Sequence, residues 1–103
     1  MDVAQALQGR PEGVPTIVLA HQPRAAMEAI EWEDVQLVLS GHTHAGQLIP
    51  YNLLVYAIQP LFFGLYQPRP GVYVYVSSGT HFFFFPVRHL FDPEIVHFTL
   101  HPR

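Results

Sequence analysis

Two short apolar runs, separated by a segment with helical spacing, constrain the fold of this chain most strongly. Residues 16–20 form a β-branched apolar run without alternation, and residues 35–39 form a second apolar run. Such runs are typical of strands covered on both faces of a sheet. Between them, Pro23 can occupy the first turn of a helix, and residues 24–31 are good helix formers with Met27 and Ile30 on one face. Strand, helix and strand together predict a parallel crossover unit and an α/β fold.

Histidines follow both predicted strands. His21 comes directly after the first run, and the second run leads into a glycine-punctuated loop that contains His42 and His44. Open α/β sheets bind ligands at the carboxyl ends of neighbouring strands. We therefore expect the three histidines to lie at one edge of the sheet.

The three histidines are candidate metal ligands, because neutral imidazole is the commonest protein ligand of metal ions near neutral pH. His42 and His44 are two positions apart, so in an extended loop they point to the same side. Gly41 and Gly46 permit the backbone turns that the loop needs. On these residues alone, a metal site and a structural coincidence are about equally supported.

The composition indicates that something covers this chain. Half of its 103 residues are hydrophobic and only 13% are charged, against about 25% in an ordinary soluble domain. A missing part of the same fold, a membrane and a partner subunit are all candidates for the cover. A net charge of −3 without lysine disfavours electrostatic nucleic-acid binding. The absence of cysteine excludes disulfides and thiolate ligands.

The rest of the chain is less regular. Residues 1–13 read as a poorly defined lead-in with a possible short helix and without the pattern of a signal peptide. Residues 48–66 are apolar and aromatic, but Pro60 interrupts them, so we expect an interfacial or partner-covered loop rather than a membrane span. A turn is expected at residues 67–71, a strong strand at 72–77 and a weaker closing strand at 94–100.

Several motifs together resemble a known family. His21-Gln22-Pro23, the loop from Gly41 to Gln47 and the later residues 76–80 are similar to the closing motifs of the calcineurin-like metallophosphoesterase superfamily. Residues 86–88 and 93–95 resemble the end of the same subgroup. The aromatic stretch that ends at residues 64–66 is similar to a transmembrane subgroup. The resemblance covers about residues 14–100.

The resemblance implies the C-terminal half of an α/β sandwich with α-β-β-α layers, incomplete in this chain, with four or five strands and one or two helices. Residues 48–71 would be an apolar insertion in that domain. His21 and His42 match ligands of a second metal ion, and His44 matches a ligand of the first. Loop residues that support these ligands are Gly41, Thr43 and Gln47.

The superfamily's other motifs are not in this sequence. They supply an Asp-x-His, a bridging aspartate, and an asparagine ligand with the catalytic histidine, whereas Asp2, Asp34 and Asp92 stand in other contexts. The resemblance implies a phosphoester substrate and two divalent ions, manganese, iron or zinc, in the complete domain, where a metal-activated hydroxide attacks phosphorus.

For this chain we expect at most one ion, dependence on a missing N-terminal half, possible membrane association and little or no activity. The alternative is a non-catalytic truncated isoform, or a membrane or partner interaction module, with vestigial metal binding.

The other candidate residues have ordinary structural interpretations. His81 is expected to be a packed or capping histidine, and the phenylalanines at 82–85 are expected to be core or membrane-facing. The remaining histidines and arginines considered are assigned to the solvated surface: His89, His97, His101, Arg24 and Arg88.

Overall fold

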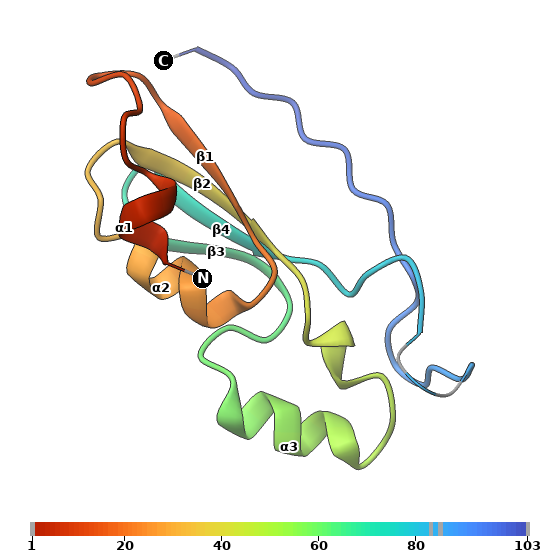
Figure 1. The fold of residues 1–103 in the computed structure, drawn as a ribbon. Coiled ribbons are helices and arrows are strands. Elements are labelled where there is room, and N and C mark those ends of the chain that lie inside the picture. The colour runs from red at the N-terminus through yellow and green to blue at the C-terminus, as the bar shows by residue number, and fades with distance from the viewer. Residues whose placement is uncertain (1, 83, 85, 103) are drawn as a thin grey trace.

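The computed structural model describes residues 2–82, 84 and 86–102. The elements in chain order are α1 (Val3–Ala6), β1 (Thr16–Ala20), α2 (Pro23–Ala29), β2 (Val35–Ser40), a 3₁₀ turn η1 (His44–Gly46), α3 (Tyr51–Ile58), β3 (Gly64–Arg69) and β4 (Val72–Val76). The four strands form one mixed sheet in the order β1-β2-β4-β3 (Figure 1).

The predicted crossover unit is confirmed. β1 and β2 pair in parallel and α2 connects them, and β4 also pairs in parallel with β2. β3 is an antiparallel strand at the edge of the sheet. The carboxyl ends of β1, β2 and β4 therefore lie at the same edge of the sheet (Figure 1). The candidate histidines come directly after β1 and β2 at this edge.

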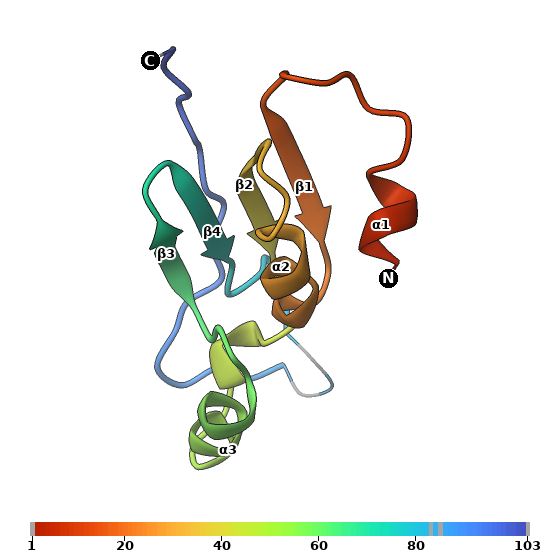
Figure 2. The same ribbon diagram turned by 90° about the vertical axis from the view of Figure 1, so that its left-hand side faces the viewer.

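One face of the sheet carries the hydrophobic core. Val18, Val38 and Val74 lie side by side on β1, β2 and β4 and are at most 8% exposed. Ala26 and Ala29 of α2 are fully buried against them, and Figure 2 shows α1 and α2 on this side of the sheet. Small side chains on α2 let the helix approach the valines closely, and this packing fixes the helix over the crossover.

The opposite face is only partly covered, which contradicts the expectation for β1. Ile17 and Leu19 are 47% and 75% exposed, whereas their neighbours on β1 alternate into the core. Successive side chains of a strand point to opposite faces, so the unalternating run places apolar groups on a face that nothing comparable to α2 covers among the described residues. The sheet and α2 together supply one β layer and one α layer of the four layers expected in the complete domain.

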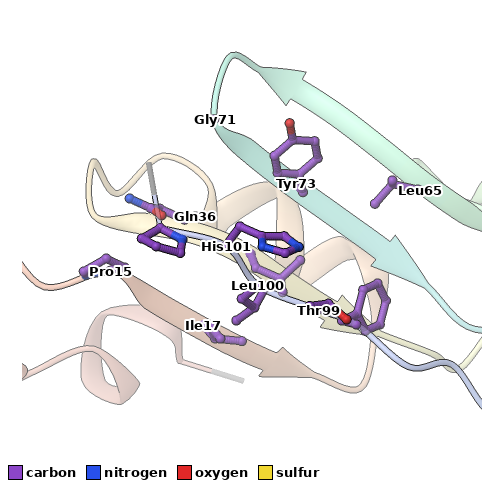
Figure 3. Close-up of a pocket in the computed structure, with 12 residues that line it drawn as sticks. Pro15, Ile17, Gln36, Leu65, Gly71, Tyr73, Thr99, Leu100 and His101 are labelled. Atoms are coloured by element: carbon purple, nitrogen blue, oxygen red, sulfur yellow. The ribbon is translucent and has the colours of Figure 1, made fainter.

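The last part of the C-terminal segment (residues 90–102) crosses this open face. Figure 2 shows it on the side of the sheet opposite α2, and it encloses with the sheet an apolar cavity of about 680 Å³ (Figure 3). Residues from both walls line the cavity: Ile17, Leu37, Leu65, Tyr73, Phe98 and Leu100. The closing strand expected at 94–100 does not form, because these residues run across the side chains of the sheet and pair with no described strand.

Residues 48–66 are not a loop as expected. They form α3 and the start of β3, and the turn predicted at 67–71 shortens to Pro70 and Gly71 because β3 continues to Arg69. α3 ends at Ile58, and the next residue, Gln59, is extended, as expected for a residue that precedes proline. Within the part of the chain that the structure describes, no helix has both the length and the apolar character needed to cross a bilayer.

Candidate metal centre

Three connecting segments meet at the carboxyl edge of the sheet. They are the short connection at His21 after β1, residues 41–47 after β2 and residues 77–81 after β4. The backbone N–H of Gly41 donates to the carbonyl of His21 at 3.1 Å, and that of Ser77 donates to the carbonyl of Ser40 at 2.8 Å. The parallel pairing thus continues for one residue beyond the strands. It brings together loops that are far apart in the sequence, as the strand–helix–strand pattern predicted.

His21 and His42 converge at this edge. His21 Nε2 lies 3.0 Å from His42 Nδ1, and the two exposed rings meet edge to face with centroids 4.8 Å apart. Two imidazole nitrogens that share a tetrahedral zinc-like ion, each about 2.0–2.1 Å from it, lie about 3.3 Å apart. A small rotation of either ring gives that spacing, so this pair fits a shared divalent ion.

His44 is placed differently. Its ring is half-buried beside Gly79, where a β-carbon would lie 3.7 Å from His44 Nδ1. Burial lowers the pKa of His44, the backbone of His81 opposes this shift, and the charge of Arg88 adds to it. His44 is therefore held in the neutral form that binds metal ions. Among the described residues, no three His, Cys, Asp or Glu side chains form a group that could hold an ion.

The loop that carries His42 and His44 has an unusual backbone. His42, His44, Ala45 and Gln47 have positive φ angles of 68°, 48°, 48° and 45°. Residues with a β-carbon adopt this region rarely, at a cost of about 1–3 kcal/mol each. The extended loop assumed from the sequence is therefore wrong, and the directions of the two histidines come from a left-handed turn. Strain of this kind is typical of functional sites.

Thr43 and Gln47 are buried supports of this loop. Thr43 Oγ1 donates to the carbonyl of Phe62 at 2.7 Å and accepts from the N–H of Ala45 at 3.4 Å. The N–H of Gln47 donates to the carbonyl of His44 at 3.0 Å. Thr43 thereby connects the loop to the chain that leads into β3, a contact that the sequence does not reveal.

The two glycines of the loop differ. Gly46 has a φ of 69°, and a β-carbon on it would lie 2.2 Å from Asn52 Cα. Gly41 has open space at the corresponding position and no positive φ. The backbone therefore requires glycine at Gly46, and the conformational reason predicted for Gly41 is not found.

The acidic residues lie in other environments. Asp34 pairs with Arg10 through two 2.6 Å contacts, which lower the pKa of Asp34. Asp2 caps α1 by accepting from the N–H of Gln5. Glu94 accepts from the Tyr75 hydroxyl at 2.8 Å. These three carboxylates have other partners, and among the described residues no carboxylate joins the histidines in a group that could hold an ion.

Two residues assigned to the solvated surface, the half-buried Arg88 and the exposed His89, contact the loop. Arg88 is half-buried and donates to the carbonyl of His44 at 3.0 Å. The N–H of His89 donates to the carbonyl of Gln47 at 2.9 Å, and its Nδ1 accepts from the N–H of Ile49 at 3.1 Å. No periodicity or spacing marks these positions, because their partners lie 40 to 44 positions away in the sequence.

The remaining candidates divide as follows. His81 is exposed, with its ring 4.0 Å from that of Phe82, so it is not packed inside the protein. Phe82 and Phe84 are 37% and 80% exposed, which excludes a core position for these two, while residues 83 and 85 lie outside the described residues. The residues that are exposed as expected are Arg24, His89, His97 and His101.

Comparison with known proteins gives the class. The chain is 46% identical over 102 residues to a metallophosphoesterase of Helicobacter pylori, covering 99% of this chain and 28% of that protein. It is 49% identical over 89 residues to the transmembrane protein with metallophosphoesterase domain of Bos taurus, covering 85% and 20%. The protein of the same name from Danio rerio is 46% identical over 101 residues, covering 97% and 23%.

The chain is thus a homologue of metallophosphoesterases along nearly its whole length. Proteins named for a transmembrane metallophosphoesterase are among its relatives, in agreement with the resemblance of the aromatic stretch. The chain spans about a quarter of the length of these relatives. No family model matches it, and no solved structure matches it.

Proposed function

We propose that this chain is the C-terminal part of a metal-dependent phosphoric ester hydrolase, in which His21, His42 and His44 are metal ligands. The observation that carries the proposal is the 3.0 Å approach of His21 Nε2 to His42 Nδ1 at the carboxyl ends of adjacent parallel strands. Homology to metallophosphoesterases supports the same assignment.

The three histidines have separate tasks in this proposal. His21 and His42 present two nitrogens to one divalent ion. His44, neutral because burial lowers its pKa, serves a second ion. The bound ions would supply Lewis-acid stabilisation of the charge that develops on a phosphoryl group. The left-handed loop and its buried Thr43 set the directions of His42 and His44.

The chain by itself is expected to be inactive. A two-metal clamp needs a ligand that holds the ions about 3.5–4 Å apart, and no carboxylate among the described residues joins the histidines in a group that could hold an ion. We infer that the remainder of the domain supplies that ligand together with the catalytic histidine. The substrate is therefore proposed only as a phosphoester.

The test is a comparison of metal binding with turnover. The purified chain, titrated with Zn²⁺ alone, should show histidine ring shifts at His21 and His42 in NMR spectra, and His42→Ala should abolish them. With Mn²⁺ the same chain should not hydrolyse p-nitrophenyl phosphate. Turnover that disappears in His42→Ala would refute the inactive chain. Zn²⁺ shifts that persist in His42→Ala would refute the ligand assignment.

A second candidate function is an interaction module with vestigial metal binding. The observation that favours it is the apolar surface of α3, where Leu53, Leu54 and Tyr56 are 65%, 55% and 68% exposed. Exposed apolar patches are common at partner or membrane interfaces. If the complete protein hydrolyses no phosphoester while it still binds a partner or vesicles through α3, this function replaces the first.

A further inference from the structure

Arg88 makes an unusual set of contacts for an arginine assigned to the surface. Its guanidinium donates to four backbone carbonyls: Nη2 to His44 at 3.0 Å and to Ser78 at 2.9 Å, Nη1 to His81 at 2.7 Å and Nε to Phe91 at 2.8 Å. These carbonyls belong to three segments, namely the metal loop, the loop after β4 and the C-terminal segment. One side chain therefore ties three segments together.

The chemistry of the guanidinium suits this task. Its five N–H donors lie in one plane as a rigid fork, and four contacts at 2.7–3.0 Å use that fork almost completely. Arg10 offers a contrast, because two of its contacts go to the Asp34 carboxylate. The guanidinium of Arg88 instead contacts only backbone carbonyls in the hydrogen bonds described. Its position therefore depends on the backbone segments that it joins.

The contacts of Nη2 matter most for the site. The same nitrogen bonds the carbonyl of His44 and the carbonyl of Ser78. The ring of His44 lies beside Gly79, the next residue after Ser78, with 3.7 Å between His44 Nδ1 and the position of a β-carbon on Gly79. His44 is thus held by its backbone to the segment against which its ring packs.

We propose that Arg88 is a positioning residue that holds the His44 ligand against the loop after β4. This inference rests on the proposed function for the role of His44. The brace, by which we mean the four contacts of Arg88 with backbone carbonyls, does not depend on metal binding. Without Arg88, the carbonyl of His44 loses its contact with the guanidinium, so the left-handed residues of the loop lose one of the contacts that hold them. The convergence of His21 and His42 has its own support in the contact between the N–H of Gly41 and the carbonyl of His21, so we expect it to persist without Arg88.

The test compares Arg88→Met and Arg88→Lys with Arg69→Met in the 103-residue chain. Arg69 is a matched control, because it is an exposed arginine that makes one carbonyl contact, to Trp32, near the other end of the sheet. NMR spectra of ¹⁵N-labelled chain without metal should show altered His44 ring shifts and altered backbone couplings at residues 44–47 in both Arg88 variants. The ring shifts of His21 and His42, and all shifts of the loop in Arg69→Met, should stay as in the wild type.

Zn²⁺ titration gives a second measurement. The Zn²⁺ concentration that shifts the rings of His21 and His42 should be the same in Arg88→Met as in the wild type, because the guanidinium of Arg88 contacts neither residue. The altered His44 ring shifts should persist in Arg88→Lys, because a single ammonium cannot reach four separated carbonyls. If Arg88→Met loses its fold, Arg88→Lys, which keeps the charge and the aliphatic stem, decides between the outcomes.

The outcomes separate the two proposals. Unchanged His44 shifts and loop couplings in a folded Arg88 variant overturn the brace, whatever the metal does. A wild-type chain that binds no Zn²⁺ at any of the three histidines, with His44 still displaced in Arg88→Met, overturns the proposed function and leaves the brace in place.

Discussion

Backbone conformation at single residues controls the metal loop. Gly46 combines a φ of 69° with a close approach of Asn52 at the start of α3. The sequence identified Gly46 as a turn residue but could not identify Asn52 as its neighbour, because only the packing of α3 against the loop brings them together. The requirement for glycine is therefore steric as well as conformational.

Gly46→Ala should be strongly destabilising. The new methyl group would meet backbone atoms of Asn52, and the positive φ adds a cost of about 1 kcal/mol or more. We expect a total loss of about 2–4 kcal/mol in the free energy of unfolding, measured by urea denaturation.

Gly9→Ala is the control for this prediction. Gly9 has a φ of 75° and open space at the β-carbon position, so it carries the conformational cost alone. Equal losses of stability in the two variants would show that the Asn52 contact contributes nothing.

The pKa of Tyr75 depends on its contact with Glu94 in the C-terminal segment. Burial, followed by its hydrogen bond to Glu94, raises the pKa of Tyr75 from 10.0 to about 12. A raised pKa in the folded state means that the stabilisation is present below pH 10 and is lost as the pH rises toward 12.

Tyr75→Phe should therefore change the alkaline behaviour. The difference in unfolding free energy between wild type and variant should shrink as the pH rises from 10 toward 12, because the wild type then loses its protonated tyrosine. Ultraviolet absorbance should also show that the tyrosine that titrates last in the wild type is missing from the variant. A difference independent of pH would contradict the assignment.

Among the elements, the two faces of the sheet differ most. Val74 is fully buried between β2 and β3 under α2, while Leu19 is 75% exposed on the other face. Both residues looked equally apolar in the sequence. Burial, rather than residue type, sets how much each contributes to stability.

Alanine substitutions should separate the faces. Val74→Ala should lower the free energy of unfolding by about 2 kcal/mol, since it removes buried apolar surface and leaves a cavity. Leu19→Ala should change it by less than about 0.5 kcal/mol. Thermal and urea unfolding measure both, and a large loss for Leu19→Ala would mean that this face is covered in solution.

Element boundaries were predictable where the pattern was local. β1 was predicted at its observed bounds, and β2 and β4 within one residue. Met27 and Ile30 were expected to share one face of the helix, but Met27 is 41% exposed and Ile30 only 6%, because the helix turns Ala26 and Ala29 to the sheet. α3 was missed because all of its residues except Asn52 are apolar or aromatic, so no polar face gives it an amphipathic spacing.

For the whole molecule, the open face and the segment that crosses it form one unit. Phe98 packs against Tyr75 with ring centroids 5.1 Å apart, and together with its neighbours it covers Ile17, Leu37 and Tyr73 in the cavity. This cover has no strand pairing with the sheet, so it depends on side-chain packing and on the Glu94 contacts.

Removal of residues 95–103 should expose that face. The shortened chain should bind the hydrophobic dye ANS more strongly than the full chain and should self-associate in analytical ultracentrifugation, because large apolar patches are rarely left bare. Phe98→Ala, which keeps the chain length, should show a smaller increase of the same kind. Dye binding equal to that of the full chain would mean that the segment does not cover the face.

The sequence by itself determined the parallel crossover, the three histidines at the strand ends and the likeness to metallophosphoesterases, because these depend on local patterns and short motifs. Only the tertiary structure decided that His21 and His42 converge within 3.0 Å, that the loop is left-handed and that Arg88 braces His44. Such contacts join residues up to 44 positions apart. Their geometry depends on packing, which no local spacing encodes.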